Sequence, residues 1–427
     1  YDNDGVKTKG NYVSGVRNGD WAEYYQGIWW YDYGEDGEAN TKDTLESNNR
    51  WDSVEVVIPD FKPKFKVQGS YLNGNRDGTW TEYYENRKRK NELNYSKGKF
   101  NGLQSYWNEN GNKIEEKNYV NGKQEGLWTK FYEETGIKKE ETYYKDGVQQ
   151  GLWAEWFKDG QKKRERNFSN GERDSIWTTW YDNGNKKMEG IYQDGLMDGV
   201  WTYYYSDGVI NSKGQFANGD GGNIHKKSRI PQNGRNGEWI IYYPNGNVNA
   251  KYQYVDGAFD QERLEWYDNG NKKIEMHYSN GIPNGSRLEW YKNGQKKLKE
   301  IYADGVKNEN IYAWHQNGQK KHHYFYVKGK KNQSWTAWWP NGNTKIEGNF
   351  KEGNKDGQFT FWYENGQKKL DCLFLDGVKA GAWIAWHQNG NKKRHYFHND
   401  GKRDQTWIAW WPNGNRKIEG NFKKGLK

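Results

Sequence analysis

Residues 177–201 read WTTWYDNGNKKMEGIYQDGLMDGVW, and close relatives of this stretch recur along most of the 427-residue chain. One series of glycines includes Gly184 and recurs mostly every 24 residues, and a second series follows 11 residues later through Gly195. Self-similarity at a fixed period of this length indicates a repeat array, in which each unit buries its apolar face against its neighbours. The function is therefore expected on a long surface rather than in one pocket.

Two turns divide each repeat into two strands. Asn183-Gly184 lies between strand-like runs, and Asn-Gly is the typical sequence of a two-residue type I′ hairpin turn. The second turn, Asp194-Gly195 through Gly199, matches a longer connection of three to five residues. The sequence therefore predicts an all-β fold: an elongated, solenoid-like array of antiparallel β-hairpin repeats with a 24-residue period.

Side chains can be assigned to faces by counting the first tryptophan of each repeat, Trp177 in the quoted stretch, as position 0. A two-residue turn pairs position 4 with 9, 2 with 11 and 1 with 12. Positions 0, 4, 11 and 15 then share one face, which holds three aromatic rings in most repeats and is expected to be the core. Positions 3, 10 and 12 share the other face, where Trp180 lies beside Lys187 and Glu189.

Position 3 forms an aromatic ladder on the second face, flanked by Lys and Glu. Strands that curl could bury this ladder, or the rings could remain partly exposed and bind sugars or protein partners. Nine of its tryptophans make up the candidate binding surface: Trp156, Trp180, Trp266, Trp290, Trp314, Trp338, Trp362, Trp386 and Trp410.

The composition limits what the core can be. Only 33% of residues are hydrophobic, but 17% are aromatic, with 25 Trp, 33 Tyr and 15 Phe, so the core is expected to be a thin layer of stacked rings. The single cysteine, Cys372, excludes an internal disulfide and is interpreted as a small apolar strand residue. No stretch is long and apolar enough to predict a transmembrane segment.

The ends of the sequence lead to two expectations. The first residue is Tyr1 rather than Met, which slightly favours a cell-envelope or extracellular location over the cytoplasm. The last strand, near residues 416–422, is expected to pair with further chain, with a partner or with a second copy, because exposed edges recruit strands.

Departures from the period define the expected organisation. Residues 26–60 carry nine acidic side chains against two basic ones, which indicates an acidic insertion or a degenerate repeat. Residues 314–353 match residues 386–425 at 29 of 40 positions, so a three-repeat block is duplicated at an offset of 72 residues. The segments are 1–25 (N-terminal repeat), 26–60 (acidic insertion), 61–219 (hairpin repeats), 220–233 (basic insertion) and 234–427 (hairpin repeats with the duplicated block).

Pairs of lysines follow the Asn-Gly turns. Successive hairpins repeat about every 10 Å, so these ammonium groups are expected to form one basic stripe. An anionic polymer could lie along it, but nearby Glu offsets much of the charge and lysines keep sheet surfaces soluble, so no nucleic acid is expected. The stripe comprises Lys186, Lys187, Lys272, Lys273, Lys296, Lys297, Lys320, Lys321, Lys368, Lys369, Lys392 and Lys393.

Histidines gather in the duplicated block. His315 and His322 are expected on one face as diagonal neighbours, close enough to share a metal ion. The second copy has Arg394 in place of His322, so imidazole standing in for an aromatic ring is favoured, and no metal or cofactor is expected. The sequence contains no nucleophile elbow, phosphate loop or paired catalytic carboxylates, which predicts that the protein is not an enzyme.

Each repeat has the pattern aromatic-x-x-Tyr/Trp-x-x-Asn-Gly, followed by Tyr-x-x-Gly-x-x-x-Gly-x-Trp. This pattern resembles the bacterial MORN-type repeat family, in the variant often called an antitoxin component. The resemblance covers residues 10–25 and about 61–427, and it implies hairpin repeats in an elongated twisted sheet that act as scaffolds or binding surfaces without catalysis. Four repeats depart from the pattern because the leading Trp is replaced by Gln104, Arg263, Arg287 or Ile311.

These observations favour a non-enzymatic scaffold or adaptor that binds protein partners or assembles through its sheet edges. The alternative is a cell-surface carbohydrate-binding module that uses the aromatic ladder on a glycan. An immunity role against a toxin is the third function considered.

Overall fold

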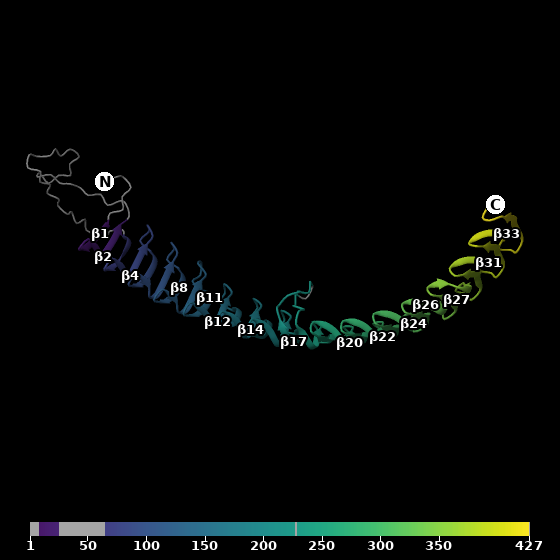
Figure 1. The fold of residues 1–427 in the computed structure, drawn as a ribbon, viewed down its shortest axis with the longest axis horizontal. Helices are drawn as coiled ribbons and strands as arrows, with labels where there is room; N and C mark the ends of the chain where they lie inside the picture. Colours follow the sequence, from purple (N-terminus) through teal and green to yellow (C-terminus); the bar gives the residue numbers. More distant parts are fainter. Residues whose placement is uncertain (1–7, 25–64, 227–228, 427) are drawn as a thin grey trace, which may run out of the picture. The chain divides into compact units, whose positions relative to one another are not determined.

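A computed structural model describes residues 8–24, 65–226 and 229–426. Every regular element in this part of the chain is a β-strand, and the 34 strands belong to one antiparallel sheet in which most consecutive strands pair (Figure 1). The predicted all-β array of antiparallel hairpins is therefore confirmed. No helix in the described ranges is long and apolar enough to cross a membrane.

The chain divides into two compact units, and the division of the sequence falls at β15 (Lys186–Gln193) and the turn after it. The strands before β15 are β1 (Thr8–Val13), β2 (Val16–Tyr24), β3 (Phe65–Leu72), β4 (Asn75–Tyr83), β5 (Arg89–Ser96), β6 (Lys99–Phe100), β7 (Gly102–Trp107), β8 (Lys113–Val120), β9 (Lys123–Gln124), β10 (Gly126–Phe131), β11 (Lys138–Lys145), β12 (Val148–Trp156), β13 (Lys162–Ser169) and β14 (Glu172–Trp180).

The strands after β15 belong to the second unit. They are β16 (Leu196–Tyr204), β17 (Ile210–Gly219), β18 (Arg235–Tyr242), β19 (Val248–Val255), β20 (Ala258–Trp266), β21 (Lys272–Ser279), β22 (Ile282–Trp290), β23 (Lys296–Ala303), β24 (Val306–Trp314), β25 (Lys320–Val327), β26 (Lys330–Trp338), β27 (Thr344–Lys351), β28 (Asn354–Lys355), β29 (Gly357–Trp362), β30 (Lys368–Leu375), β31 (Val378–Trp386), β32 (Lys392–Asn399), β33 (Lys402–Trp410) and β34 (Arg416–Phe422).

The Asn-Gly turns are not the two-residue type I′ turns that the sequence predicted. In the turn after β14, the Tyr181 N–H donates to the Asn185 carbonyl at 2.8 Å, and the Gly184 N–H donates to the Tyr181 carbonyl at 3.1 Å. Only Gly184 has a positive φ, of 83°, while Asn183 does not. This is a three-residue loop, a type I turn closed by a left-handed glycine. The Asn183 side chain favours it by accepting the Asn185 N–H at 3.1 Å.

The Asp-Gly turns are the true two-residue turns, so the prediction of a longer connection there is wrong. β15 ends at Gln193 and β16 begins at Leu196. Asp194 and Gly195 both have positive φ, of 48° and 81°, as a type I′ turn requires. The strand resumes immediately after them.

The corrected turns change the register inside each hairpin. Between β20 and β21, Glu265 pairs with Ile274, which confirms the predicted pairing of position 2 with 11. The predicted pairing of 4 with 9 is wrong, because Trp266 at position 3 pairs with Lys272 at position 9. Lys273 at position 10 is left unpaired in a bulge and turns to the other face, where it makes a 3.0 Å ion pair with Glu265.

The sheet therefore has two chemically distinct faces. The core face carries positions 0, 2, 10, 11, 13 and 15, and the ladder face carries positions 3, 9 and 12. The predicted placement of positions 0 and 15 on one face is confirmed at Trp177 and Tyr192, whose ring centroids lie 4.7 Å apart.

A continuous layer of rings forms the core of each unit, as the composition predicted. Within the second unit, the buried Trp239 ring packs edge-on against Phe216 at 5.0 Å. Trp239 lies so close to the preceding strand that a Cβ added to Gly214 would come within 2.2 Å of its ring. Trp80 lies over Gly69 in the same way within the first unit. Position 13 is therefore a glycine where the next ring needs its space.

Three of the four repeats that lack the leading Trp replace ring packing with polar contacts, whereas Ile311 in the fourth is a buried apolar side chain. Gln104 is fully buried, and its amide both accepts the Asn94 N–H and donates to the Asn94 carbonyl at 2.9 Å. Arg287 instead forms ion pairs with Glu289 and, at 3.3 Å, with the buried Glu300. The core face thus continues through these three repeats by hydrogen bonds and charge pairs.

The two insertions differ in what the structure describes. The acidic segment 26–60 lies outside the described residues. The basic segment 220–233 forms the connection between β17 and β18, apart from residues 227–228.

Candidate functional site

The tryptophan ladder lies at the ends of the strands that precede the three-residue loops. Every ladder tryptophan is half-buried, so the rings are neither sealed in the core nor fully exposed. Between Trp314 and Trp338 the ladder face is hollowed by about 340 Å³, and Gly318, Lys320 and Gly342 line the hollow with the two rings. The ladder is therefore a row of partly accessible rings.

The first lysine of each pair belongs to the ladder face. Lys272 lies 5.7 Å from the ring of Trp290, and Lys320 lies 5.7 Å from Trp338, each above the ladder ring of the next repeat. Lys272 also pairs with Glu275 at 2.8 Å, so carboxylates at position 12 offset part of this charge. The members of this row in the predicted stripe are Lys186, Lys272, Lys296, Lys320, Lys368 and Lys392.

The second lysine of each pair belongs to the core face, because the bulge at position 10 turns it there. Two rows of lysines on opposite faces replace the predicted single basic stripe, and Lys273, for example, does not share the face of Trp266. The members of the second row in the predicted stripe are Lys187, Lys273, Lys297, Lys321, Lys369 and Lys393.

Position 4 has a role that the sequence did not reveal. Its side chain reaches the next repeat and donates to the backbone carbonyl of the ladder residue there. Tyr243 bonds the Trp266 carbonyl at 2.9 Å, and in the duplicated block His315 and His387 bond the carbonyls of Trp338 and Trp410 at 3.1 Å. Tyr or His recurs at this position, 23 residues before the ladder residue that it contacts. This recurrence is the sequence signal from which the contact could have been predicted.

The turn asparagines make a second set of contacts between repeats. The Asn269 side chain donates to the Lys292 carbonyl at 3.0 Å, and Asn341 donates to the Glu364 carbonyl at 2.9 Å. Each such Asn also accepts a backbone N–H inside its own turn. One side chain therefore shapes its loop and fixes the distance to the next loop.

The histidines stand in for rings and hydrogen-bond donors. His398 occupies position 15, is buried and packs against Trp383 at 5.0 Å, which confirms the interpretation of imidazole as a ring. His315 is engaged with the Trp338 carbonyl, and His322 packs against Tyr324 at 5.7 Å. No cluster of three or more His, Cys, Asp or Glu side chains suited to a metal ion occurs among the described residues.

These histidines should make stability depend on pH. Burial, with Lys321 and His315 nearby, lowers the pKa of His322 to about 4, and burial with Lys379 and Arg403 nearby lowers the pKa of His398. The unfolded chain therefore binds more protons, so stability present above about pH 6.5 is lost as the pH falls towards 4. The loss from His322 should be roughly 1 kcal/mol after solvent screening, and His398 should add to it in the same direction.

Thermal unfolding at pH 7.5 and pH 5 measures this effect. The double variant His322→Ile, His398→Phe carries residues found at these positions in other repeats, and its melting temperature should fall less on acidification than that of the natural chain. An equal fall in both proteins would contradict the assignment.

The cysteine is structural. Cys372 is buried against Phe359 and Phe374, as the sequence predicted for an apolar strand residue. Burial raises the pKa of its thiol to about 11, so it is protonated at neutral pH.

Comparison with known proteins gives a family match. A model described as the MORN repeat variant matches seven segments: residues 76–97, 100–121, 173–194, 197–218, 235–256, 262–280 and 355–376. No curated protein matches the chain.

Solved structures give only remote likenesses. The crystal structures of TcdB2-TccC3 and of TcdB2-TccC3-Cdc42 share 10% and 12% identity with the chain, each at a TM-score of 0.15, over 95% and 98% of its length. A structure of the Photorhabdus luminescens Tc holotoxin pore shares 13% identity at a TM-score of 0.16, over 98% of this chain and 19% of the other. The chain spans about a fifth of the length of these proteins, and a likeness at such scores supports no conclusion about the fold or the function of this chain.

The seven matches lie on both sides of β15, in the same hairpins whose turns, rings and glycines recur with the repeat. This chain is a MORN-type repeat protein.

Proposed function

We propose that this protein is a non-enzymatic scaffold whose repeat surface binds other proteins. The observation that carries the proposal is the pair of hydrogen bonds between successive repeats, from the position 4 side chain and from the turn Asn. They hold neighbouring hairpins at a constant spacing. Side chains of one kind are thereby presented in rows, with little ordering left to occur on binding.

The ladder face offers the anchors that protein interfaces favour. Half-buried tryptophans supply large rigid contact areas, and neighbouring lysines and carboxylates supply a polar rim. A binding role needs no catalytic group, and the proposal includes no enzymatic activity.

Site-specific photo-crosslinking in the source cells tests the proposal. The full chain would carry benzoylphenylalanine in place of Trp338, and a matched chain would carry it in place of Leu375, an exposed residue beside an Asp-Gly turn. We expect discrete protein adducts from the ladder site and none from the control site. Equal labelling from both sites, or no protein adduct from the ladder, would contradict a protein-binding ladder.

A second candidate function is binding of a glycan, and the hollow between Trp314 and Trp338 favours it, because sugars stack on accessible rings. A glycan array with the natural chain and a Trp314→Ala, Trp338→Ala variant distinguishes the two functions. Binding of a glycan that the variant loses, without protein adducts, would support the carbohydrate module.

A further inference from the structure

The lysines at position 10 fall into two groups that differ in what lies at position 2. Four of the repeats up to residue 305 have a glutamate at position 2, and the lysine at position 10 pairs with it across the hairpin. These pairs are Lys90–Glu82 and Lys163–Glu155 at 2.8 Å, Lys273–Glu265 at 3.0 Å and Lys297–Glu289 at 2.9 Å. In these four repeats the charge on the core face is neutralised locally.

From Ile311 onward position 2 is never acidic. It is occupied by Ala313, Ala337, Phe361, Ala385 and Ala409. The corresponding lysines are Lys321, Lys345, Lys369, Lys393 and Lys417, and none of them makes an ion pair within residues 229–426 or the other described ranges.

Instead of a carboxylate, three of these lysines, Lys345, Lys369 and Lys417, have an aromatic ring beneath them. Lys345 lies 4.1 Å from the Trp339 ring, and Lys417 lies 4.0 Å from Trp411, its counterpart 72 residues later. The same arrangement therefore occurs twice in the duplicated block. A cation over a ring keeps its full charge and remains available to an anion.

A second row of cations runs alongside, four residues before each leading ring. Lys331, Lys355, Lys379 and Arg403 lie over core rings at distances such as 4.2 Å from Lys331 to Tyr324 and 4.7 Å from Arg403 to Tyr396. None of the four makes an ion pair with a described residue. Burial and the neighbouring Lys307 and Lys355 lower the pKa of Lys331, which indicates unrelieved positive potential.

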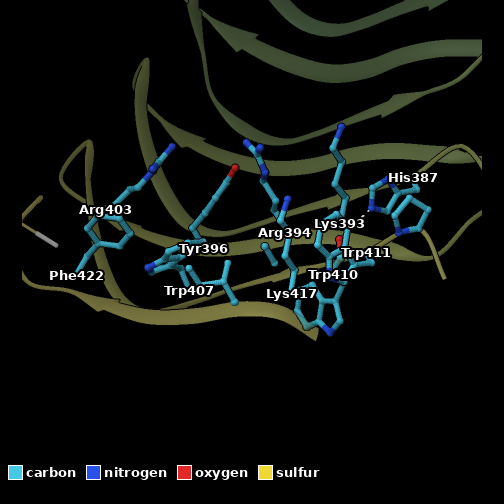
Figure 2. Close-up of a pocket in the computed structure, with 13 residues that line it drawn as sticks. His387, Lys393, Arg394, Tyr396, Arg403, Trp407, Trp410, Trp411, Lys417 and Phe422 are labelled. Atoms are coloured by element: carbon cyan, nitrogen blue, oxygen red, sulfur yellow. Dashed lines mark hydrogen bonds between the residues drawn. The ribbon is translucent and has the colours of Figure 1, made fainter. Parts of the chain in front are cut away.

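We call these nine cations and the rings beneath them the acid-free surface. Between Ile311 and Phe422, none of the core-face positions 0, 2, 10, 11, 13 and 15 carries Asp or Glu. In the last hairpins the surface is hollowed by about 690 Å³. Figure 2 shows the side chains of Lys393, Arg394 and Arg403 pointing to the same side, and Arg403 lies over the rings of Tyr396 and Phe422.

We propose that the acid-free surface binds an extended acidic segment of a partner protein, with a carboxylate at about every third residue. The inference rests on the proposed protein-binding function and names the chemistry of the partner. Successive lysines in a row are two strands apart, about 9.5 Å, and three residues of an extended chain span about 10 Å. Each carboxylate would accept charge-assisted hydrogen bonds from one repeat.

Other anions and sugars fit less well. Duplex DNA carries one charge per about 1.7 Å, so cations about 9.5 Å apart would meet few of its phosphates. Single-stranded nucleic acid needs free ring faces, but lysines cover Trp339 and Trp411. A neutral sugar needs hydrogen-bond acceptors as well as donors, and Lys and Arg side chains supply donors alone.

The test measures binding of a fluorescein-labelled 15-residue peptide with Glu at every third position in a Ser, Thr and Gly background. Fluorescence anisotropy with the full chain should show saturable binding that weakens with added salt. A peptide with Gln in place of every Glu should not bind. Failure of the Glu peptide to bind would overturn the inference. The proposed scaffold function would then still be supported if the crosslinker at position 338 gave protein adducts.

Adjacent lysines on opposite faces provide a matched control. The variant Lys321→Gln, Lys369→Gln, Lys393→Gln removes three charges from the acid-free surface, and Lys320→Gln, Lys368→Gln, Lys392→Gln removes three from the ladder face of the same hairpins. We expect the first to weaken peptide binding at least about tenfold and the second less than about twofold. Circular dichroism would verify that both variants fold.

Two further results would overturn the proposal. One is equal weakening by the two triple variants, which would indicate a general charge effect. The other is tighter binding of heparin or of a single-stranded oligonucleotide than of the Glu peptide, which would assign the surface to a different polymer.

Discussion

Replacing Trp239 with alanine is expected to lower the free energy of unfolding by about 3 to 5 kcal/mol. The Trp239 side chain is 1% exposed, lies over Gly214 and packs against Phe216. Its indole N–H also donates to the Gln215 carbonyl at 2.8 Å. Alanine would leave a cavity beside a glycine, where no neighbouring side chain can move in to fill it.

Trp266→Ala is the matched control on the ladder face of the next repeat. That ring is only half-buried, so we expect the free energy of unfolding to fall by less than about half of the fall caused by Trp239→Ala. Urea unfolding followed by circular dichroism measures both. Equal losses would show that the ladder is as much a part of the core as position 0, and would argue against its role as a binding surface.

Replacing Arg287 with alanine is expected to cost about 3 to 5 kcal/mol as well, although the residue replaced is charged. Glu300 is 3% exposed, and its carboxylate forms ion pairs with Arg287 at 3.3 Å and Lys307 at 2.5 Å. It also accepts a hydrogen bond from the Tyr302 hydroxyl at 2.9 Å. Burial alone would raise the pKa of the nearby Glu289, but Lys297 and Arg287 hold it below its usual value. Without Arg287, two buried carboxylates would lose a counter-charge.

The double variant Arg287→Leu, Glu300→Leu separates the cost of an unpaired charge from the cost of lost packing. It should recover at least half of the stability, because replacing both members of a buried ion pair with apolar groups is often neutral. Arg416→Ala, which breaks an exposed pair with Glu419, should cost less than about 1 kcal/mol. A double variant as unstable as Arg287→Ala would show that the charges themselves stabilise this repeat.

The fold class could be predicted from the sequence because its signals are local. A glycine after Asn or Asp marks a turn wherever it occurs, and rings 15 residues apart, as in Trp177 and Tyr192, fall on one face of a hairpin. The period, the strands and the ring core all follow from residues within one repeat.

The turn types could not be predicted in the same way. Asn-Gly favours a type I′ turn in an isolated hairpin, but here Asn269 donates to the Lys292 carbonyl of the next repeat. That contact is made between repeats and favours the three-residue loop. The exchange of turn types introduced the bulge at position 10 and moved Lys273 to the opposite face from the one predicted.

The sequence by itself determined that this protein is an array of 24-residue β-hairpins with an aromatic core, because ring and turn spacing act within a single repeat. The tertiary structure alone decided which lysines share a face, that the tryptophan ladder is half-buried, and that the nine cations of the acid-free surface have no carboxylate partner among the described residues. These properties depend on which side chains face each other across neighbouring strands, and a one-residue bulge reverses that assignment without changing the repeat pattern.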